Sequence, residues 1–296
     1  MNNPVIDIRD LSKFYGKTKG IEHVNLEIGE GEIFGFIGPN GAGKSTTIRI
    51  LMNLIFPSGG SARIMGMDVI RQTREIKYKV GYIPSDANAY SSMNVDEFLN
   101  YFIRFYQVPD GGKRIAELSK LFELDLKRKI GDLSMGNRKK VSIVQSLIHN
   151  PGLLIMDEPT TGLDPLMQSV FFELLRSENR KGMTLFFSSH ILGEVQMFCK
   201  RVAIIKEGKI IQIEDIDNLR KKQLKKVFIE FVEQVNIENF SIPGTVNLSA
   251  KPGNIISFMY SGNINELVSF LSGRKVNNLI IEEPSLDEIF MHYYQI

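Results

Sequence analysis

The stretch "GPNGAGKST", residues 38–46, decides the fold that this sequence predicts. It fits the pattern G-x-x-x-x-G-K-[ST], which is meaningful only between a strand and a helix. The apolar "EIFGFIG" before it predicts a buried strand, and "STTIRILMNLI" at its end predicts a helix. Glycines let backbone N–H groups converge on phosphate oxygens, and a helix N-terminus adds its positive dipole. The residues expected to bind a nucleotide are Gly38, Pro39, Asn40, Gly41, Ala42, Gly43, Lys44, Ser45 and Thr46.

A second stretch, "LLIMDEPTTGLDP" at residues 153–165, ends an apolar run in two adjacent acids, Asp157 and Glu158. Charge at the end of a buried strand is costly unless a cation meets it. In phosphate-loop enzymes that cation is Mg²⁺, which a loop serine and a strand-end aspartate hold. We therefore expect Ser45 and Asp157 to hold Mg²⁺, and Lys44 to contact the β- and γ-phosphates. Glu158 is expected to act as general base, or to orient the water that attacks the γ-phosphate.

Apolar segments alternate with helical patterns over residues 1–220, which predicts an α/β fold around a mainly parallel sheet. Short polar turns between the early strands predict an antiparallel patch, and residues 87–150 predict an inserted helical subdomain. The predicted strands are Val5–Arg9, Val24–Ile28, Glu32–Gly38, Val80–Pro84, Leu153–Glu158, Thr184–Ser189, Arg201–Lys206 and Lys209–Glu214, the last two as a hairpin. The predicted helices cover 44–55, 94–107, 112–123, 135–149, 165–180, 191–200 and 215–223.

Residues 221–296 have a different pattern of apolar and polar residues, which predicts a small α+β accessory domain. The expected strands are Val227–Val232, Val246–Ala250, Ile255–Tyr260 and Val276–Ile281, with a helix over Asn265–Leu271. The last residues, "EEPSLDEIFMHYY", predict a terminal helix with Ser285 and Glu288 at capping-box spacing. This region carries no chemical motif, so we expect packing or dimer support, with ligand sensing as the alternative.

Composition sets limits on the function. The chain has 296 residues, 43% of them hydrophobic, and a net charge of +2, which gives no broad field for nucleic acid. No stretch approaches the roughly 18 consecutive apolar residues of a membrane helix, and "MNNPVIDIRD" lacks the features of a signal peptide. We therefore expect a cytoplasmic protein. The single cysteine, Cys199, excludes internal disulfides and a cysteine-rich zinc site.

Three further stretches separate the classes of protein that share a phosphate loop. "LSMGNRKKV" at 133–141 predicts the start of a helix, "TGLDP" at 161–165 follows the two acids, and "SSH" at 188–190 ends the next apolar strand. In this order, over residues 4–215, the chain resembles the ATP-binding subunits of ABC transporters. The resemblance implies a phosphate-loop NTPase fold, with a RecA-like core, an antiparallel β subdomain and an inserted helical subdomain.

The resemblance also implies roles for five further residues. Ser134 and Gly136 would contact the γ-phosphate bound by a second subunit, and Asp164 would lie at the same dimer interface. His190 would contact the γ-phosphate of its own site, and Tyr15 would stack on the adenine ring. Taken alone, each side chain has a simpler explanation, such as a helix cap for the serine or a surface position for the tyrosine.

The sequence departs from the family pattern in two places. The signature L-S-G-G-Q reads L-S-M-G-N here, with Met135 and Asn137 substituted and both phosphate-binding positions kept. In "VGYIPSDANAY", where the family commonly has a glutamine after the proline, Ser85 and Asp86 follow Pro84. In the family this loop links the magnesium site to the membrane partner. We expect Asp86 either to replace the glutamine partly in that link, by offering an anionic oxygen to Mg²⁺ or a bound water, or only to cap the turn.

The family implies an ATP-hydrolysing subunit that powers transport through a separate integral membrane permease. "EEPSLDEIF" and the altered signature resemble lone cassettes of bacterial exporters of drugs, antibiotics and peptides, which favours export over import. The expected second partner is another ATPase subunit, as a homodimer or heterodimer on the inner face of the membrane. The alternative is a soluble ABC-type ATPase acting on ribosomes or nucleic acid, but such proteins usually join two cassettes. A GTPase is less expected, because no N-K-x-D stretch is present.

Overall fold

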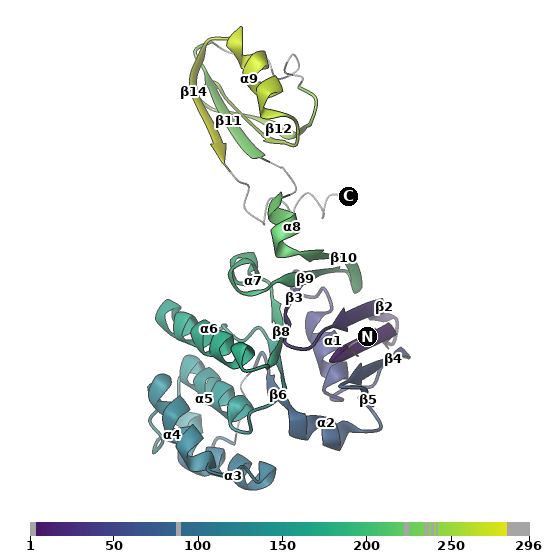
Figure 1. The fold of residues 1–296 in the computed structure, drawn as a ribbon, viewed down its shortest axis with the longest axis vertical. Helices are drawn as coiled ribbons and strands as arrows, with labels where there is room; N and C mark the ends of the chain where they lie inside the picture. The colour runs from purple at the N-terminus through teal and green to yellow at the C-terminus, as the bar shows by residue number, and fades with distance from the viewer. Residues whose placement is uncertain are drawn as a thin grey trace. The chain divides into compact units, whose positions relative to one another are not determined.

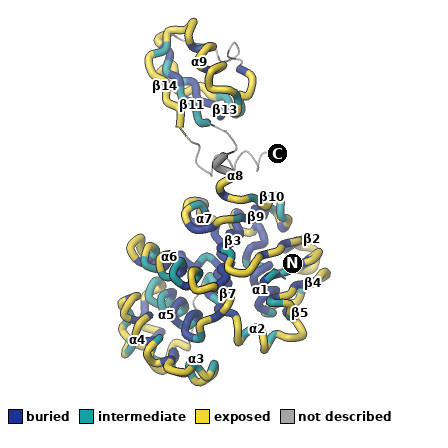
Figure 2. Tube along the Cα trace, in the orientation of Figure 1, coloured by how far each residue is buried: buried dark blue, intermediate teal, exposed yellow. Residues whose placement is uncertain are grey.

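The computed structural model describes residues 4–86, 90–221 and 225–282, except residues 234, 236, 238, 239 and 241. The chain divides into two compact units, Met1–Glu214 and Asp215–Ile296. The described residues of each unit surround a hydrophobic core of their own (Figures 1 and 2). None of the described helices has the length and apolar character of a bilayer-spanning segment.

The first unit is built on a six-stranded sheet with the strand order β10-β9-β3-β8-β7-β6 (Figure 1). Neighbouring strands from β9 to β6 run parallel, which confirms the mainly parallel sheet that the sequence predicts. Every residue of β3, β7 and β8 is buried, as is usual for parallel strands covered on both faces. The strands are β3 Ile33–Ile37, β6 Val80–Ile83, β7 Leu153–Asp157, β8 Thr184–Ser189, β9 Arg201–Lys206 and β10 Lys209–Asp215.

The register of this sheet brings the predicted site together. Ile37 of β3 lies beside Ser189 of β8, and Asp157 of β7 lies beside Ser188. Because the strands are parallel, the segments that follow them leave the sheet at one edge, where ligands bind in open α/β sheets. The phosphate loop, the acid pair and His190 all follow these strand ends.

A four-stranded antiparallel sheet of order β2-β1-β4-β5 packs into the same core. Its strands are β1 Ile6–Tyr15, β2 Thr18–Ile28, β4 Gly59–Ile64 and β5 Met67–Asp68. The predicted antiparallel patch is therefore correct, but its first two strands are longer than the sequence indicates. The prediction missed β4, β5 and the helix α2, Thr73–Lys79.

The helices of the first unit agree closely with the predicted ones. The helical subdomain is an insertion between β6 and β7, and α3, α4 and α5 lie together on the side away from the antiparallel sheet (Figure 1). Asn94 and Glu97 form a capping box at the start of α3. The helices are α1 Lys44–Leu51, α3 Val95–Tyr106, α4 Gly111–Leu121, α5 Met135–Leu147, α6 Pro165–Arg180 and α7 Leu192–Phe198.

The second unit contains a four-stranded antiparallel sheet of order β12-β13-β11-β14, packed against the helix α9. Its elements are α8 Ile216–Lys221, β11 Lys225–Phe231, β12 Thr245–Lys251, β13 Ile255–Tyr260, α9 Ile264–Ser272 and β14 Val276–Glu282. Alternate residues Val227, Ile229 and Phe231 of β11 enter the core, as the period of a strand requires. The predicted terminal helix, with Ser285 and Glu288, lies outside the described residues.

Candidate nucleotide-binding site

The phosphate loop links β3 to α1, and its last residue before the helix must be glycine. Gly43, directly before α1, has a φ of 110°, and a Cβ there would lie 2.6 Å from the Ile21 side chain. The Ala42 N–H donates to the Pro39 carbonyl at 3.1 Å, and the Gly208 N–H donates to the Ala42 carbonyl at 2.9 Å. The turn of the β9–β10 hairpin, which contains Gly208, therefore stabilises the phosphate loop through a backbone hydrogen bond.

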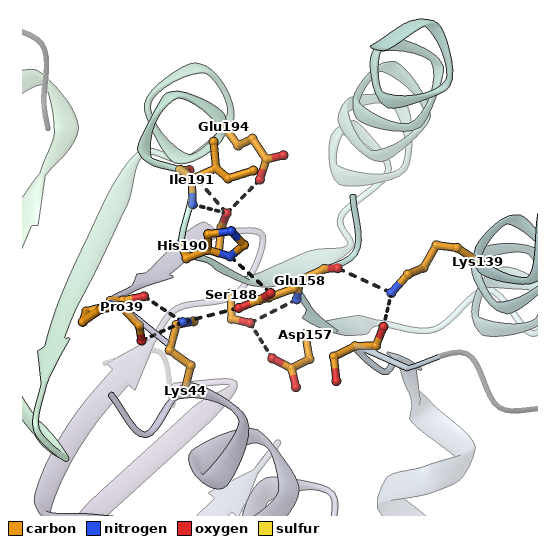
Figure 3. A network of polar contacts seen from close by, with 12 residues as sticks. Pro39, Lys44, Lys139, Asp157, Glu158, Ser188, His190, Ile191 and Glu194 are labelled. Atoms are coloured by element: carbon orange, nitrogen blue, oxygen red, sulfur yellow. Dashed lines mark hydrogen bonds and ion pairs between the residues drawn. The ribbon is translucent and has the colours of Figure 1, made fainter. Parts of the chain in front are cut away.

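Lys44 begins α1 and is only 4% exposed. Its Nζ donates to the carbonyl oxygens of Gly38 at 2.7 Å and Pro39 at 3.1 Å, and lies 3.4 Å from Glu158 Oε1 (Figure 3). The ammonium group is thus held between the phosphate loop and the end of β7. Ser45, the next residue, is half-buried in the first turn of α1.

Asp157 is fully buried at the end of β7. One carboxylate oxygen, Oδ1, accepts a hydrogen bond of 2.8 Å from the Ser188 hydroxyl (Figure 3). The other, Oδ2, has no hydrogen-bond partner among the described residues. An unpartnered buried carboxylate oxygen is suited to a hard cation such as Mg²⁺, so the residues present fit a magnesium ion.

Glu158 lies where β7 ends and has a left-handed backbone, with a φ of 46°. Neighbouring residues of a regular strand would point to opposite faces of the sheet. The left-handed turn breaks this alternation, and such a conformation costs a non-glycine residue about 1–2 kcal/mol. The carboxylate lies between two cationic or titratable groups, with Oε1 3.4 Å from Lys44 Nζ and Oε2 3.2 Å from His190 Nδ1 (Figure 3).

His190 and Tyr15 are the exposed members of the predicted site. The His190 side chain, at the end of β8, is 41% exposed and still touches Glu158. Tyr15 is 47% exposed at the end of β1, where its ring edge packs against Gly20 and Lys13 Nζ lies 5.2 Å from the ring centroid.

The three residues that the resemblance assigns to a dimer interface also stabilise the single chain. Ser134 caps α5 by accepting from the Asn137 N–H at 3.3 Å, and Asp164 caps α6 by accepting from the Met167 N–H at 2.9 Å. A Cβ on Gly136 would lie well inside contact distance of the Gly162 carbonyl oxygen. The first turn of α5 therefore packs on the backbone of the "TGLDP" segment within one chain.

The sequence prediction missed Lys139, which belongs to this site. The residue is 1% exposed, and its Nζ donates to the carbonyl oxygens of Pro84 at 2.9 Å, Ser85 at 2.8 Å and Glu158 at 3.4 Å (Figure 3). Desolvation lowers the pKa of Lys139, and the nearby carboxylates, including the exposed Asp86, act against that shift. One signal was available, since Lys139 precedes the apolar Ile143 and Leu147 by one and two helical turns.

The sequence is similar to those of known proteins. A family model described as "ABC transporter" matches residues 21–161. The bacitracin transport ATP-binding protein BcrA of Bacillus licheniformis is 35% identical over 230 residues, which cover 77% of this chain and 74% of the relative. The ABC transporter ATP-binding protein NatA of Bacillus subtilis is 36% identical over 72% of this chain and 90% of its own length.

The fold is similar to solved structures as well. A bacterial ABC transporter cassette, solved as a dimer, superposes with a TM-score of 0.66 and 28% identity, covering 71% of this chain and 98% of the cassette. The matched family region contains the phosphate loop, the signature and the acid pair. The chain is therefore a member of the ABC transporter family, an ATP-binding subunit that hydrolyses ATP.

Proposed function

We propose that this subunit powers export of a drug, antibiotic or peptide through integral membrane permease subunits on separate chains. The main support is the 35% sequence identity to BcrA, a relative named for bacitracin transport. Relatives named for linearmycin resistance and Nod factor export favour the same direction. The expected alternative, a soluble ATPase acting on ribosomes or nucleic acid, is not favoured, because the relatives are named for transport. Such a subunit would sit on the inner face of the membrane.

The proposed chemistry follows from the charges of the site. Lys44 binds the β- and γ-phosphates, with the loop backbone around it, and Glu158 takes a proton from the water in line with the γ-phosphate. Mg²⁺ held by Ser45 and Asp157 would neutralise phosphate charge in the transition state. His190 holds Glu158 from the open side and contacts the γ-phosphate. Phosphate oxygens compete with Glu158 for Lys44, so nucleotide binding frees the acid for the attacking water.

ABC ATP-binding subunits act as pairs with membrane permeases, and we propose a head-to-tail dimer for this chain. Its second member would be another copy or a related cassette. In this arrangement Ser134 and Gly136 contact the γ-phosphate bound by the other subunit, and Asp164 crosses the same interface. Ser134 and Asp164 are exposed residues at helix N-termini, which supports this role. Tyr15, exposed beside the loop, is the residue proposed to stack on adenine.

The test is transport by the reconstituted pair. The chain is co-expressed with the permease that co-purifies with it, and inside-out vesicles are assayed for ATP-dependent uptake of bacitracin. Uptake by the normal protein, and none with the Glu158→Gln variant, is the expected result. ATP-dependent release of a preloaded nutrient from the lumen of these vesicles would show import and would contradict export. Purification with ribosomes and no membrane protein would favour the soluble alternative.

A further inference from the structure

Lys139 of the signature helix α5 has an unusual environment for a lysine. It is 1% exposed, whereas lysines are almost never fully buried unless their charge is paired. An ammonium group has three N–H donors, and three carbonyl oxygens accept from it, those of Pro84, Ser85 and Glu158. All three donors are therefore used, and every acceptor belongs to the backbone.

These acceptors come from two segments that are distant in sequence. Pro84 and Ser85 form the loop after β6, through which the chain enters the helical subdomain. Glu158 ends β7 and carries the acid beside Lys44. Figure 3 shows Lys139 on the opposite side of Glu158 from Lys44. One side chain thus joins the entry of the helical subdomain, its signature helix and the catalytic end of the core sheet.

A second contact holds the same helix to the same segment. Gly136, one turn before Lys139, packs directly on the Gly162 carbonyl, four residues beyond Glu158. The segment from 158 to 162 is therefore held against α5 at both of its ends. A shift of α5 would displace the Glu158 backbone, whose left-handed φ of 46° already departs from the usual conformation of such a residue.

We propose that Lys139 is a positioning residue for ATP hydrolysis, which makes the orientation of Glu158 depend on the position of the helical subdomain. The inference rests on the proposed role of Glu158. Ser85 takes part through its backbone carbonyl, so the side chain that replaces the family glutamine is not the connection. In this arrangement the link from the loop to the catalytic acid passes through Lys139.

The experiment compares Lys139→Met, which keeps an unbranched side chain without donors, with Lys140→Met on the same helix. Lys140 is the matched control, because it is half-buried and no contact with the site is described for it. We expect kcat of Lys139→Met to fall on the order of 100-fold, as for a small misplacement of a catalytic group. Affinity for ATP without Mg²⁺ should stay within about threefold, since the phosphate loop supplies those contacts. Lys140→Met should match the normal protein in both.

Hydrogen exchange supplies a readout independent of turnover. Amides in residues 81–86 and 157–162 should exchange faster in Lys139→Met and not in Lys140→Met. Lys139→Gln keeps two N–H donors and should recover about tenfold of the lost kcat, together with part of the protection, because positioning rather than charge is restored. If Lys139→Met does not fold, Lys139→Gln is compared directly with the normal protein, and a fall in kcat of about tenfold with ATP affinity kept is expected.

Two results would overturn the proposal. The first is a folded Lys139→Met variant with normal kcat and normal hydrogen exchange. The second is a parallel loss of ATP affinity, kcat and protection from exchange throughout the first unit, which would show that Lys139 only stabilises the fold. Failure of the proposed function gives a different pattern. If Glu158→Gln hydrolyses ATP normally, Glu158 is not the base, but exchange in Lys139→Met still reports whether Lys139 holds the two segments.

Discussion

The central residue is Glu158, whose carboxylate has a partner on each side. Lys44 contacts one oxygen and His190 the other, while Lys139 binds the carbonyl of the same residue. Both carboxylate oxygens and the carbonyl oxygen of Glu158 are thus contacted by side chains from different parts of the unit. The contacts with His190 and Lys139 do not depend on Lys44, so they hold Glu158 oriented as its proposed role of general base requires.

Glu158→Gln should keep ATP binding and reduce turnover by roughly 100-fold or more, because an amide cannot take the proton of the attacking water. Affinity for ATP should be equal or higher, since Lys44 loses an anionic competitor for phosphate. With ATP and Mg²⁺ the variant should accumulate as a nucleotide-bound dimer in sizing chromatography. Glu173→Gln, an exposed acid of α6 paired with Arg176, is the control and should behave as the normal protein. Normal hydrolysis by the variant would remove Glu158 from the mechanism.

The sequence predicts much of this site, but only the part that side-chain motifs encode. Lys44, Asp157 and Glu158 stand in short patterns whose residue types are required by phosphate and metal. Lys139 has no such pattern, because its partners are backbone carbonyls, which any residue provides. The closest of these partners in the sequence, Glu158, is 19 residues away, and those of the β6 loop are 54 and 55.

At the scale of elements, two residues of α5 fix its position. Lys139 binds three backbone carbonyl oxygens, and Gly136 packs on the Gly162 carbonyl. Gly136→Ala should lower the free energy of unfolding by about 1–3 kcal/mol, because the new methyl group meets a backbone carbonyl that cannot move away freely. Urea unfolding measures this. Gly112→Ala in α4 is the control, because a Cβ there has open space, and it should raise stability by up to about 1 kcal/mol. Equal effects of the two changes would exclude the close contact.

The junction between α5 and β6 should respond to pH. His149 stacks on Tyr106 with ring centroids 4.1 Å apart, and its Nε2 lies 3.3 Å from the Val80 carbonyl. Burial lowers the pKa of His149 to about 4, and Nδ1 has no partner among the described residues. In the unfolded chain His149 is therefore protonated below about pH 6.5, whereas in the folded protein it is protonated only below about pH 4.

The contribution of neutral His149 to the free energy of unfolding is fully present above about pH 6.5 and is lost as the pH falls towards 4. Between about pH 7 and pH 5 the free energy of unfolding should fall by about 2 kcal/mol. Urea unfolding at both pH values tests the prediction. His149→Phe keeps an aromatic ring against Tyr106 and removes the titrating group, so its stability should fall less over this interval. Equal pH dependence of the two proteins would assign the effect to other groups.

Elements were predictable where burial follows a regular period. The central strands and α6 were placed within a residue or two, because they are continuous apolar runs or carry a cap such as Asp164. The strand β4 was missed because only Ala62 and Ile64 of its six residues are buried and two glycines begin it. The β1 strand continues to Tyr15 past the exposed Asp10, which has a φ of 52°, and through register shifts between Ile8 and Phe14 that interrupt the regular alternation of a strand.

The whole molecule combines a cassette, for which we propose a partner cassette, with a second unit that has its own core. Ser134→Arg should prevent the ATP-dependent dimer, because one substitution affects both sites of a symmetric pair. The Glu158→Gln background and sizing chromatography with ATP measure dimer formation, and ATP binding by the monomer should remain.

Loss of the helix cap accompanies this change and costs about 1 kcal/mol. Asn94→Arg, which removes the cap of α3 and leaves the proposed interface intact, is the control for it. That variant should still dimerise. If Ser134→Arg abolishes ATP binding by the monomer itself, its role is within one chain.

Burial of the two lysines of the site has a practical consequence for handling the protein. Lys44 and Lys139 are 4% and 1% exposed, and they are the lysines classed as buried in the part of the chain that the structure describes. Amine-reactive reagents attack accessible lysines first. The protein can therefore be immobilised or tagged with a dye through its surface amines while Lys44 and Lys139 stay chemically unmodified.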